Sequence, residues 1–315
     1  MKTTRAEERP ILLGLLGDER IRRSPSPRMH ALALKCVRKK GWYVPFEPGG
    51  ADLGDLLVTF DNLGFLGFNV TAPLKEAVKP YLARLTPAAR IIGAVNTLVR
   101  LPENPGGSDR YRGYLGDNTD HLGFAEAYLN DITPREALVL GAGGAARAVI
   151  HALSKRGFVP SVAARDGKKS EILSREFGIE ALDYENIRRP FGLVVNATGA
   201  SGLKELTPPP GGLVIVGGGD PRDPERPVPA KVIDLNYGRK DNFFMKLARD
   251  SGTLFEDGLL MLAHQARYSF EAWLNATGSP TYAPLAPFLK GVGLKRSPEN
   301  ASAKNPRGRG GFPKK

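Results

Sequence analysis

The sequence has a single cysteine, Cys36, and contains no long apolar run. One thiol excludes an internal disulfide and is typical of a reducing compartment, so we expect a cytoplasmic chain. Cys36 lies in a helical pattern, where we expect it to be buried and unreactive. A membrane-spanning helix needs about 20 consecutive apolar residues. Because no segment approaches that length, the sequence predicts no membrane partner.

Two further features are missing. The apolar run at residues 11–16 is shorter than a signal-peptide core and ends in Gly-Asp-Glu-Arg, so it predicts a first strand instead. No metal is expected, because the four histidines lie far apart and show no ligand spacing; they are His30, His121, His151 and His264.

Positive charge is unevenly distributed. Residues 291–315 hold seven Lys or Arg and one Glu, and therefore account for half of the net charge of +12. This segment is rich in Gly, Pro and Ser and lacks periodicity, which predicts a disordered, solubilising tail. A nucleic-acid arm, whose binding would be salt-dependent, is the disfavoured alternative. The modest basicity of the rest suits an anionic substrate and cofactor.

Strand-like and helical patterns alternate along the chain, which predicts α/β architecture with largely parallel sheets. In the first part, we expect strands at 11–17, 41–47, 65–70 and 94–100, with a short strand around Tyr114 after a Pro- and Gly-rich loop. The helices of this part are expected at 27–41, ending at Gly41, and at 52–62.

A second unit begins near Asp117. Residues 136–157 predict a strand, a glycine turn and a helix, followed by a strand at 161–166 and a helix at 169–177. Later strands are expected at 192–198, 211–219 and 230–237, and helices at 241–252 and 257–278. Residues 217–230 are too rich in Gly, Pro and charge to pack well, so they predict an exposed insertion.

The glycine turn has the spacing of a dinucleotide site. Gly141, Gly143 and Ala146 match the G-x-G-x-x-G/A pattern between an apolar strand and a helix. Small residues let the backbone approach a pyrophosphate, and the helix N-terminus supplies donors and positive potential. A tight turn without a ligand is the alternative, but the strand–turn–helix context favours dinucleotide binding.

The end of the next strand indicates which dinucleotide is bound. Arg165, Lys168 and Lys169 suit a 2′-phosphate, because a guanidinium can bind it bidentately. NADP is therefore the expected cofactor. Two alternatives stay open: the segment can be an ordinary exposed basic loop, and a small register shift would make Asp166 the acidic residue typical of NAD sites.

Four other stretches place polar side chains where strands or turns should end: residues 23–30, 69–75, 93–97 and 116–120. Singly, they read as helix caps and turns. Together they supply the hydroxyl, amide, amine and carboxylate groups needed to bind a polyhydroxylated carboxylate. Lys75 is unusual, since it lies at the start of an expected helix, where positive charge is disfavoured.

These motifs, in order, resemble the shikimate dehydrogenase family. The matching patterns are SxSP, NVTxPxK, GAVNT, GDNTD, GAGGAxR, NAT, DxxY and DGLxMLxHQA, spread from about residue 11 to residue 290. The resemblance implies an NADP-dependent oxidoreductase of chorismate and aromatic amino-acid biosynthesis that interconverts 3-dehydroshikimate and shikimate. It also implies a monomer or homodimer that binds small molecules rather than nucleic acid.

The resemblance further implies the domain organisation. An N-terminal α/β substrate domain would span residues 1–116 and a Rossmann-type NADP-binding domain residues 117–256. C-terminal helices at 257–292 would return to the first domain, and 293–315 would form the disordered tail.

By the same resemblance, Lys75 and Asp120 form the acid–base pair, with Lys75 exchanging a proton with the substrate C3 oxygen. Desolvation and the helix start would favour the neutral amine and a nearby carboxylate the charged one, so the two effects oppose each other. The residues implied to bind substrate are Ser24, Ser26, Thr71, Lys75, Asn96, Asp120, Tyr237 and Gln265. Those implied to bind the cofactor are Gly141, Ala142, Gly143, Gly144, Ala145, Ala164, Arg165, Asp166, Lys168, Lys169, Leu235 and Gly258.

Some residues depart from the family pattern. His121 and Leu260 stand where glycine is usual, and Ala164 stands where asparagine is common. The nearest alternative is a quinate/shikimate dehydrogenase that uses NAD or NADP. A non-catalytic NADP-binding protein on the same scaffold is a second alternative, disfavoured by the intact Lys75 and Asp120.

Overall fold

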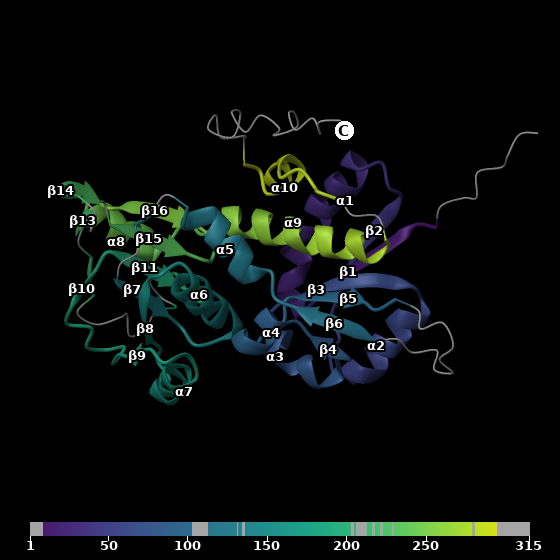
Figure 1. Ribbon diagram of the computed structural model, residues 1–315, viewed down its shortest axis with the longest axis horizontal. Helices are drawn as coiled ribbons and strands as arrows, with labels where there is room; N and C mark the ends of the chain where they lie inside the picture. Colours follow the sequence, from purple (N-terminus) through teal and green to yellow (C-terminus); the bar gives the residue numbers. More distant parts are fainter. Residues whose placement is uncertain are drawn as a thin grey trace, which may run out of the picture.

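The computed structural model shows two sheets at opposite ends of an elongated molecule, with helices α5 and α9 between and above them (Figure 1). The structure describes residues 9–102, 113–130, 132–133, 136–202, 205, 213–215, 218–220, 223–228, 230–278 and 281–294. The loop centred on residues 103–112 and the basic tail from residue 295 onward lie outside these residues.

The first sheet has the strand order β2-β1-β3-β5-β6-β4 among the described residues. Strands β1, β2 and β3 are parallel, whereas β5 runs antiparallel to both β3 and β6. The strands are β1 (Ile11–Leu16), β2 (Gly41–Phe46), β3 (Phe65–Val70), β4 (Arg84–Leu85), β5 (Thr97–Arg100) and β6 (Tyr114–Asp117). The helices of this part are η1 (Glu19–Arg23), α1 (Ser26–Cys36), α2 (Leu53–Asn62), α3 (Leu74–Ala77), η2 (Lys79–Tyr81) and α4 (Pro87–Ile92).

The second sheet is parallel, with the order β16-β15-β11-β7-β8-β9. This is the doubly wound Rossmann arrangement, in which the order reverses beside the first strand, here β7. The strands are β7 (Glu136–Leu140), β8 (Val159–Ala163), β9 (Glu180–Ala181), β11 (Leu193–Asn196), β15 (Lys231–Asp234) and β16 (Leu254–Asp257). The helices beside it are α5 (Asp120–Tyr128), α6 (Gly144–Lys155), α7 (Gly167–Phe177) and α8 (Phe243–Asp250). Two further helices, α9 (Leu259–Ala276) and α10 (Ala286–Gly291), follow the last strand.

Each sheet has helices on both faces, because its strands carry apolar side chains on both sides. Helices α1, α9 and α10 share one core with the first sheet, and α2 and α4 share another on the opposite face. Helices α5 and α6 cover one face of the second sheet and α8 the other.

Helix α9 lies directly on the first sheet. The indole Nε1 of Trp273 donates a 2.8 Å hydrogen bond to the carbonyl of Leu98. A Cβ at Gly67 would lie 2.2 Å from the same Nε1, so only glycine allows β3 and α9 to approach this closely. The C-terminal helix thus returns to the first part of the chain.

Most expected elements are confirmed, including the α/β class and the antiparallel hairpin of β5 and β6. The expected strand at 94–100 begins only at Thr97. The insertion at 217–230 contains a two-stranded antiparallel pair, β13 (Gly218–Asp220) and β14 (Asp223–Val228). Of the strand expected at 211–219, the structure describes β12 (Val214–Ile215), which pairs with β10 (Pro190–Phe191).

Two expectations about the first helix were wrong. It ends at Cys36, well before Gly41, and Arg38 takes the left-handed conformation with φ of 56°. Cys36 is exposed rather than buried, because it lies at the last turn of the helix, beside its buried face. Across the described residues, no helix combines the length and apolar character needed to cross a membrane.

Candidate active site

Four polar segments meet at one edge of the first sheet because of its mixed topology. Strands β1, β3 and β6 all end at this edge, and the antiparallel β5 begins there, so Asn69 pairs with Thr97 and Thr97 with Asp117. The chain that follows each strand carries the polar side chains. The sheet therefore brings together residues that lie far apart in the sequence.

Lys75 and Asp120 form a close ion pair at this edge. The Nζ of Lys75 donates to Oδ2 of Asp120 at 2.6 Å. Both side chains are largely buried, with 16% and 7% of their surface exposed. Helix α3, which carries Lys75, is a single turn of four residues, so its dipole is too small to make the lysine unfavourable there.

Asn96 holds the other oxygen of the Asp120 carboxylate. Its Nδ2 donates to Oδ1 of Asp120 at 2.8 Å and lies 3.2 Å from Oε1 of Gln265. Its own Oδ1 accepts from the backbone N–H of Thr119 at 2.7 Å. Asn96 therefore fixes both the carboxylate and the start of α5, and joins them to α9.

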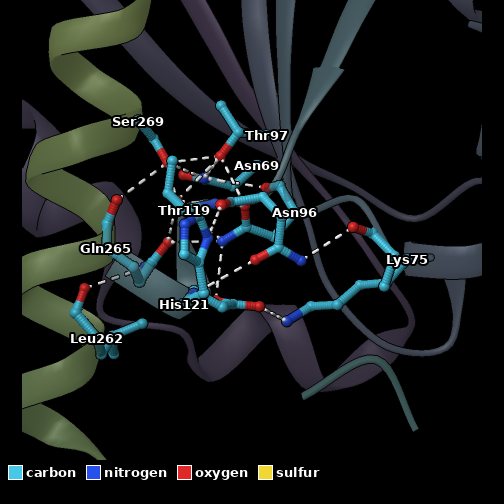
Figure 2. Close-up of polar contacts among 12 residues, drawn as sticks. Asn69, Lys75, Asn96, Thr97, Thr119, His121, Leu262, Gln265 and Ser269 are labelled. Carbon is cyan, nitrogen blue, oxygen red and sulfur yellow. Dashed lines mark hydrogen bonds and ion pairs between the residues drawn. The ribbon is translucent and has the colours of Figure 1, made fainter. Parts of the chain in front are cut away.

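A cluster of hydroxyl and amide side chains surrounds Asn96 (Figure 2). Ser269 Oγ lies 2.7 Å from the hydroxyl of Thr97 and 2.9 Å from that of Thr119, and it accepts from Asn69 Nδ2 at 2.9 Å. Thr97, Thr119 and Ser269 were not among the predicted site residues. Ser269 lies four residues after Gln265, hence on the same face of α9, and this spacing is the pattern that would have indicated it.

The site opens into a cavity of about 360 Å³ that is also lined by residues from α6 and from the chain that follows β15 and β16. All eight predicted substrate residues line it: Ser24, Ser26, Thr71, Lys75, Asn96, Asp120, Tyr237 and Gln265. Ser24 Oγ donates to Ser26 Oγ at 3.0 Å, so the two hydroxyls lie side by side. Burial raises the pKa of Tyr237, which favours its protonated, hydrogen-bond-donating form.

The cavity also has cationic walls that were not predicted. Arg20 lines it and is paired with Asp18 over 2.7 Å, and Arg239 lines it and is paired with Glu205. Arg239 follows the expected strand by a few residues and carries no motif, so its sequence position gave no indication of this role.

The predicted cofactor residues lie at the carboxyl edge of the second sheet, where parallel strands end. The glycine turn follows β7, Ala164 to Lys169 follow β8, and Leu235 follows β15. Ala145, Leu235 and Gly258 line the cavity; the remaining residues of the predicted set do not.

The glycine turn has the backbone that a nucleotide diphosphate requires. Gly141 has φ of 110°, which favours glycine, and a Cβ at Gly143 would meet no atom within 4 Å. Gly143 caps α6 without a side-chain hydrogen bond, so the first N–H groups of the helix face the turn. These features fit a pyrophosphate bound at the helix N-terminus.

The residues after β8 differ in how they are placed. Oδ2 of Asp166 and Nζ of Lys169 form an ion pair at 3.8 Å, whereas the side chain of Arg165 is exposed. Ala164 is buried. This arrangement leaves Arg165 available to an anion, as a 2′-phosphate site requires.

The expectation that the histidines lie far apart was wrong for one pair. The rings of His121 and His151 pack edge to face with centroids 5.1 Å apart, one from α5 and one from α6. Burial lowers the pKa of both, that of His151 to about 4. The described residues contain no group of three or more His, Cys, Asp or Glu side chains that could hold a metal ion.

Sequence comparison identifies the family. Residues 15–98 match the model of the shikimate dehydrogenase substrate-binding domain. The NADP(+) shikimate dehydrogenase of Roseobacter denitrificans is 36% identical over 293 residues, which cover 88% of this chain and 97% of that protein. This chain belongs to the shikimate dehydrogenase family.

Solved structures of the shikimate dehydrogenase fold agree. The shikimate 5-dehydrogenase of Thermus thermophilus, solved with NADP(H) and shikimate, has a TM-score of 0.71 and 31% identity, and covers 90% of this chain and 98% of its own. A quinate dehydrogenase from Corynebacterium glutamicum, solved with NAD, also has a TM-score of 0.71, at 27% identity and coverages of 90% and 98%. The fold is therefore shared between the two activities, and relatives of higher identity, such as those at 36% and 34%, are NADP(+) shikimate dehydrogenases.

Proposed function

We propose that this chain is an NADP-dependent shikimate dehydrogenase, which reversibly reduces the C3 carbonyl of 3-dehydroshikimate to the alcohol of shikimate. The proposal depends mainly on the Lys75–Asp120 ion pair. This pair lines the same cavity as Ala145 of the glycine turn. Family membership supplies the reaction class, and this geometry supplies the groups that it needs.

Lys75 is the proton donor to the C3 oxygen in the reducing direction and accepts the proton in reverse. Asp120, bonded to both Lys75 and Asn96, orients the amine and accepts a hydrogen bond from a substrate hydroxyl. The hydride comes from the nicotinamide of bound NADPH. Since one proton and one hydride convert the ketone to the alcohol, the reaction needs no further acid or base.

The rest of the cavity suits a carboxylate that bears hydroxyl groups. The adjacent hydroxyls of Ser24 and Ser26, with Thr71 and the phenol of Tyr237, are assigned to the substrate carboxylate. Gln265 and Asn96 are assigned to the ring hydroxyls. A buried polar group left without its partner is costly, so this set rejects substrates that lack one hydroxyl.

NADP is assigned to the edge of the second sheet. The glycine turn and the N-terminus of α6 bind the diphosphate, and Arg165 with Lys168 and Lys169 bind the 2′-phosphate. Residues 1–116 are proposed as the substrate domain, 117–256 as the cofactor domain and 257–292 as the returning helices. The separate sheets support this division.

The direct test measures reduction of nicotinamide by its absorbance with purified protein and a panel of substrates. We expect turnover of shikimate with NADP+ to exceed that of quinate with NAD+ by at least about tenfold in kcat/KM. Preferred turnover of quinate would establish the alternative enzyme. Nucleotide binding without oxidation of either acid would refute the catalytic proposal and leave a nucleotide-binding protein.

Location and assembly stay predictions. We propose that the protein works in the cytoplasm as a monomer or homodimer. We further propose that it binds no nucleic acid, because half of its net charge lies in residues 291–315 and the rest of the chain is only modestly basic. Size-exclusion chromatography with light scattering measures the oligomeric state.

A further inference from the structure

The dinucleotide pattern leaves one glycine of the turn without a role. In G-x-G-x-x-G/A, the first glycine makes the tight turn, the second lets the pyrophosphate approach, and the third position packs the helix on the sheet. Gly141, Gly143 and Ala146 occupy these three positions. Gly144, which the family resemblance includes in the cofactor set, stands at a position where the pattern allows any residue, so the pattern does not explain why it is a glycine.

The surroundings of Gly144 differ from those of its neighbour. A Cβ at Gly143 would meet nothing within 4 Å, whereas a Cβ at Gly144 would lie 3.1 Å from Cβ of Ala94 and 3.3 Å from both Cβ and Cδ of Lys75. The free space at Gly143 is what a pyrophosphate requires. The space at Gly144 is already filled by the side chain of the proposed proton donor.

The contact belongs to a larger junction between α6 and the end of α4 with the segment that leads into β5. Ala148, one turn further along α6, packs against Ile92 and Ala94, and Nη1 of Arg147 donates to the carbonyl of Ile92 at 3.3 Å. Gly144, Arg147 and Ala148 have i, i+3, i+4 spacing and so share one face of the helix. This face presses the N-terminal turn of α6 against the stem of Lys75.

We infer that Gly144 is a positioning residue: the absence of its side chain lets the start of α6 hold the Lys75 stem so that Nζ reaches Asp120. The lysine is fixed from three directions. Its amine is bound to Asp120 at 2.6 Å, its backbone carbonyl accepts from the N–H of Val95 at 2.8 Å, and its stem lies against Gly144. The turn that binds nucleotide and the residue that moves the proton are thus in direct contact.

The inference rests on the proposed function and predicts a specific division of kinetic effects. In Gly144→Ala, the added methyl displaces the Lys75 stem, so kcat at saturating nucleotide should fall by about 10- to 100-fold, the scale of a small misplacement. The Kd for NADP+ should stay within about threefold, and the pH profile of kcat should shift because the pairing of Lys75 changes.

Gly143→Ala is the matched control, since it adds the same methyl one residue earlier. Its methyl enters the space reserved for the pyrophosphate, so the Kd for NADP+ should rise by at least about tenfold. If Gly144→Ala instead weakens NADP+ binding and keeps its kcat and pH profile, Gly144 serves the nucleotide and the inference is wrong.

Two measurements separate positioning from general damage. Ala94→Gly in the Gly144→Ala background removes the 3.1 Å contact and should restore part of kcat, measured against Ala94→Gly alone. A crystal structure of Gly144→Ala reports the Lys75–Asp120 distance directly, without reference to activity. A lengthened distance supports the inference even if the wild type fails to oxidise shikimate, and an unchanged 2.6 Å bond refutes it.

Discussion

Asn96 donates a hydrogen bond of 2.8 Å from Nδ2 to Oδ1 of Asp120, the carboxylate whose other oxygen binds Lys75. The two bonds fix the plane of the Asp120 carboxylate. They therefore also fix the direction in which the Lys75 amine points at the cavity. Asn96 is 2% exposed, so its side chain is shielded from solvent. The proposed acid–base pair is therefore a triad of interacting side chains.

We predict that Asn96→Ala lowers both stability and activity. The substitution leaves Oδ1 of Asp120 and the N–H of Thr119 without these partners, at a cost of about 1–3 kcal/mol for each buried group left unsatisfied. Urea unfolding and kcat/KM measure the two effects. Asn130→Ala removes two exposed hydrogen bonds, one to the carbonyl of Glu126 and one from Arg156, and should change stability by less than about 0.5 kcal/mol. Equal effects of the two substitutions would contradict the assignment.

We predict that Lys75→Met abolishes most turnover and spares nucleotide binding. Methionine keeps the apolar stem but carries no proton, and general acid–base catalysis contributes about 10²- to 10⁴-fold. The measurement is kcat for shikimate oxidation, with the Kd for NADP+ determined by titration. Lys79→Met, four residues along the chain, is the control and should retain wild-type turnover. Residual activity above one-tenth of the wild type would exclude Lys75 as the proton carrier.

We predict that Arg165→Gln weakens the binding of NADP+ but not that of NAD+. A charge-assisted hydrogen bond to the 2′-phosphate is worth about 1.5–3 kcal/mol, which corresponds to a rise in KM for NADP+ of about 10- to 100-fold. NAD+ lacks this phosphate, so its KM should not change. Arg175→Gln, on the exposed side of α7, is the control. A parallel rise for both nucleotides would place the 2′-phosphate elsewhere.

We predict that His30 makes the protein less stable in acid. The ring is fully buried and stacks on Tyr43 with centroids 4.3 Å apart, and burial lowers the pKa of His30 to about 3. In the unfolded chain the pKa is about 6.5, so between these values the unfolded state binds more protons and stability falls as pH falls. The contribution at pH 5 relative to pH 7 is about 2 kcal/mol.

His30→Phe keeps an aromatic ring and removes the titration. Its stability relative to the wild type should therefore improve as the pH is lowered from 7 to 5, whatever its packing cost at pH 7. Denaturant unfolding at both pH values measures the difference. A difference that stays constant with pH would show that folding does not lower the pKa of His30.

Local patterns predicted most elements of the fold, because their residues carry the period of the element. The strand order could not be predicted, since it depends on which edges pair after the helices have packed. The edge strand β16 was missed because its residues, Leu254 to Asp257, carry little apolar alternation. The burial of Cys36 was misjudged, although the buried residues of α1 at 29, 30, 33 and 34 lead on to Val37 rather than to Cys36.

The site residues that belong to a sequence motif were predicted. Cavity-lining residues outside the motifs were missed. Arg20 and Arg239 depend on how the two sheets face each other, which no local pattern records. The contact of Gly144 with Lys75 is of the same kind. In sequence, a glycine in such a turn is readily attributed to nucleotide binding. Its contact with Lys75 becomes evident only in the three-dimensional structure.

The return of α9 to the first sheet affects the order in which parts of the chain can fold during synthesis. The bond between Asn69 and Ser269 joins residues 200 positions apart, and Trp273 fills a core whose other members include Leu13 and Met29. The first sheet is synthesised first but acquires its covering helix, and Gln265 with it, only after the second sheet has been made. Contacts of such long range are slow to form. A nascent chain that stops before α9 therefore leaves this apolar face of the first sheet without its covering helix, and it lacks part of the proposed site.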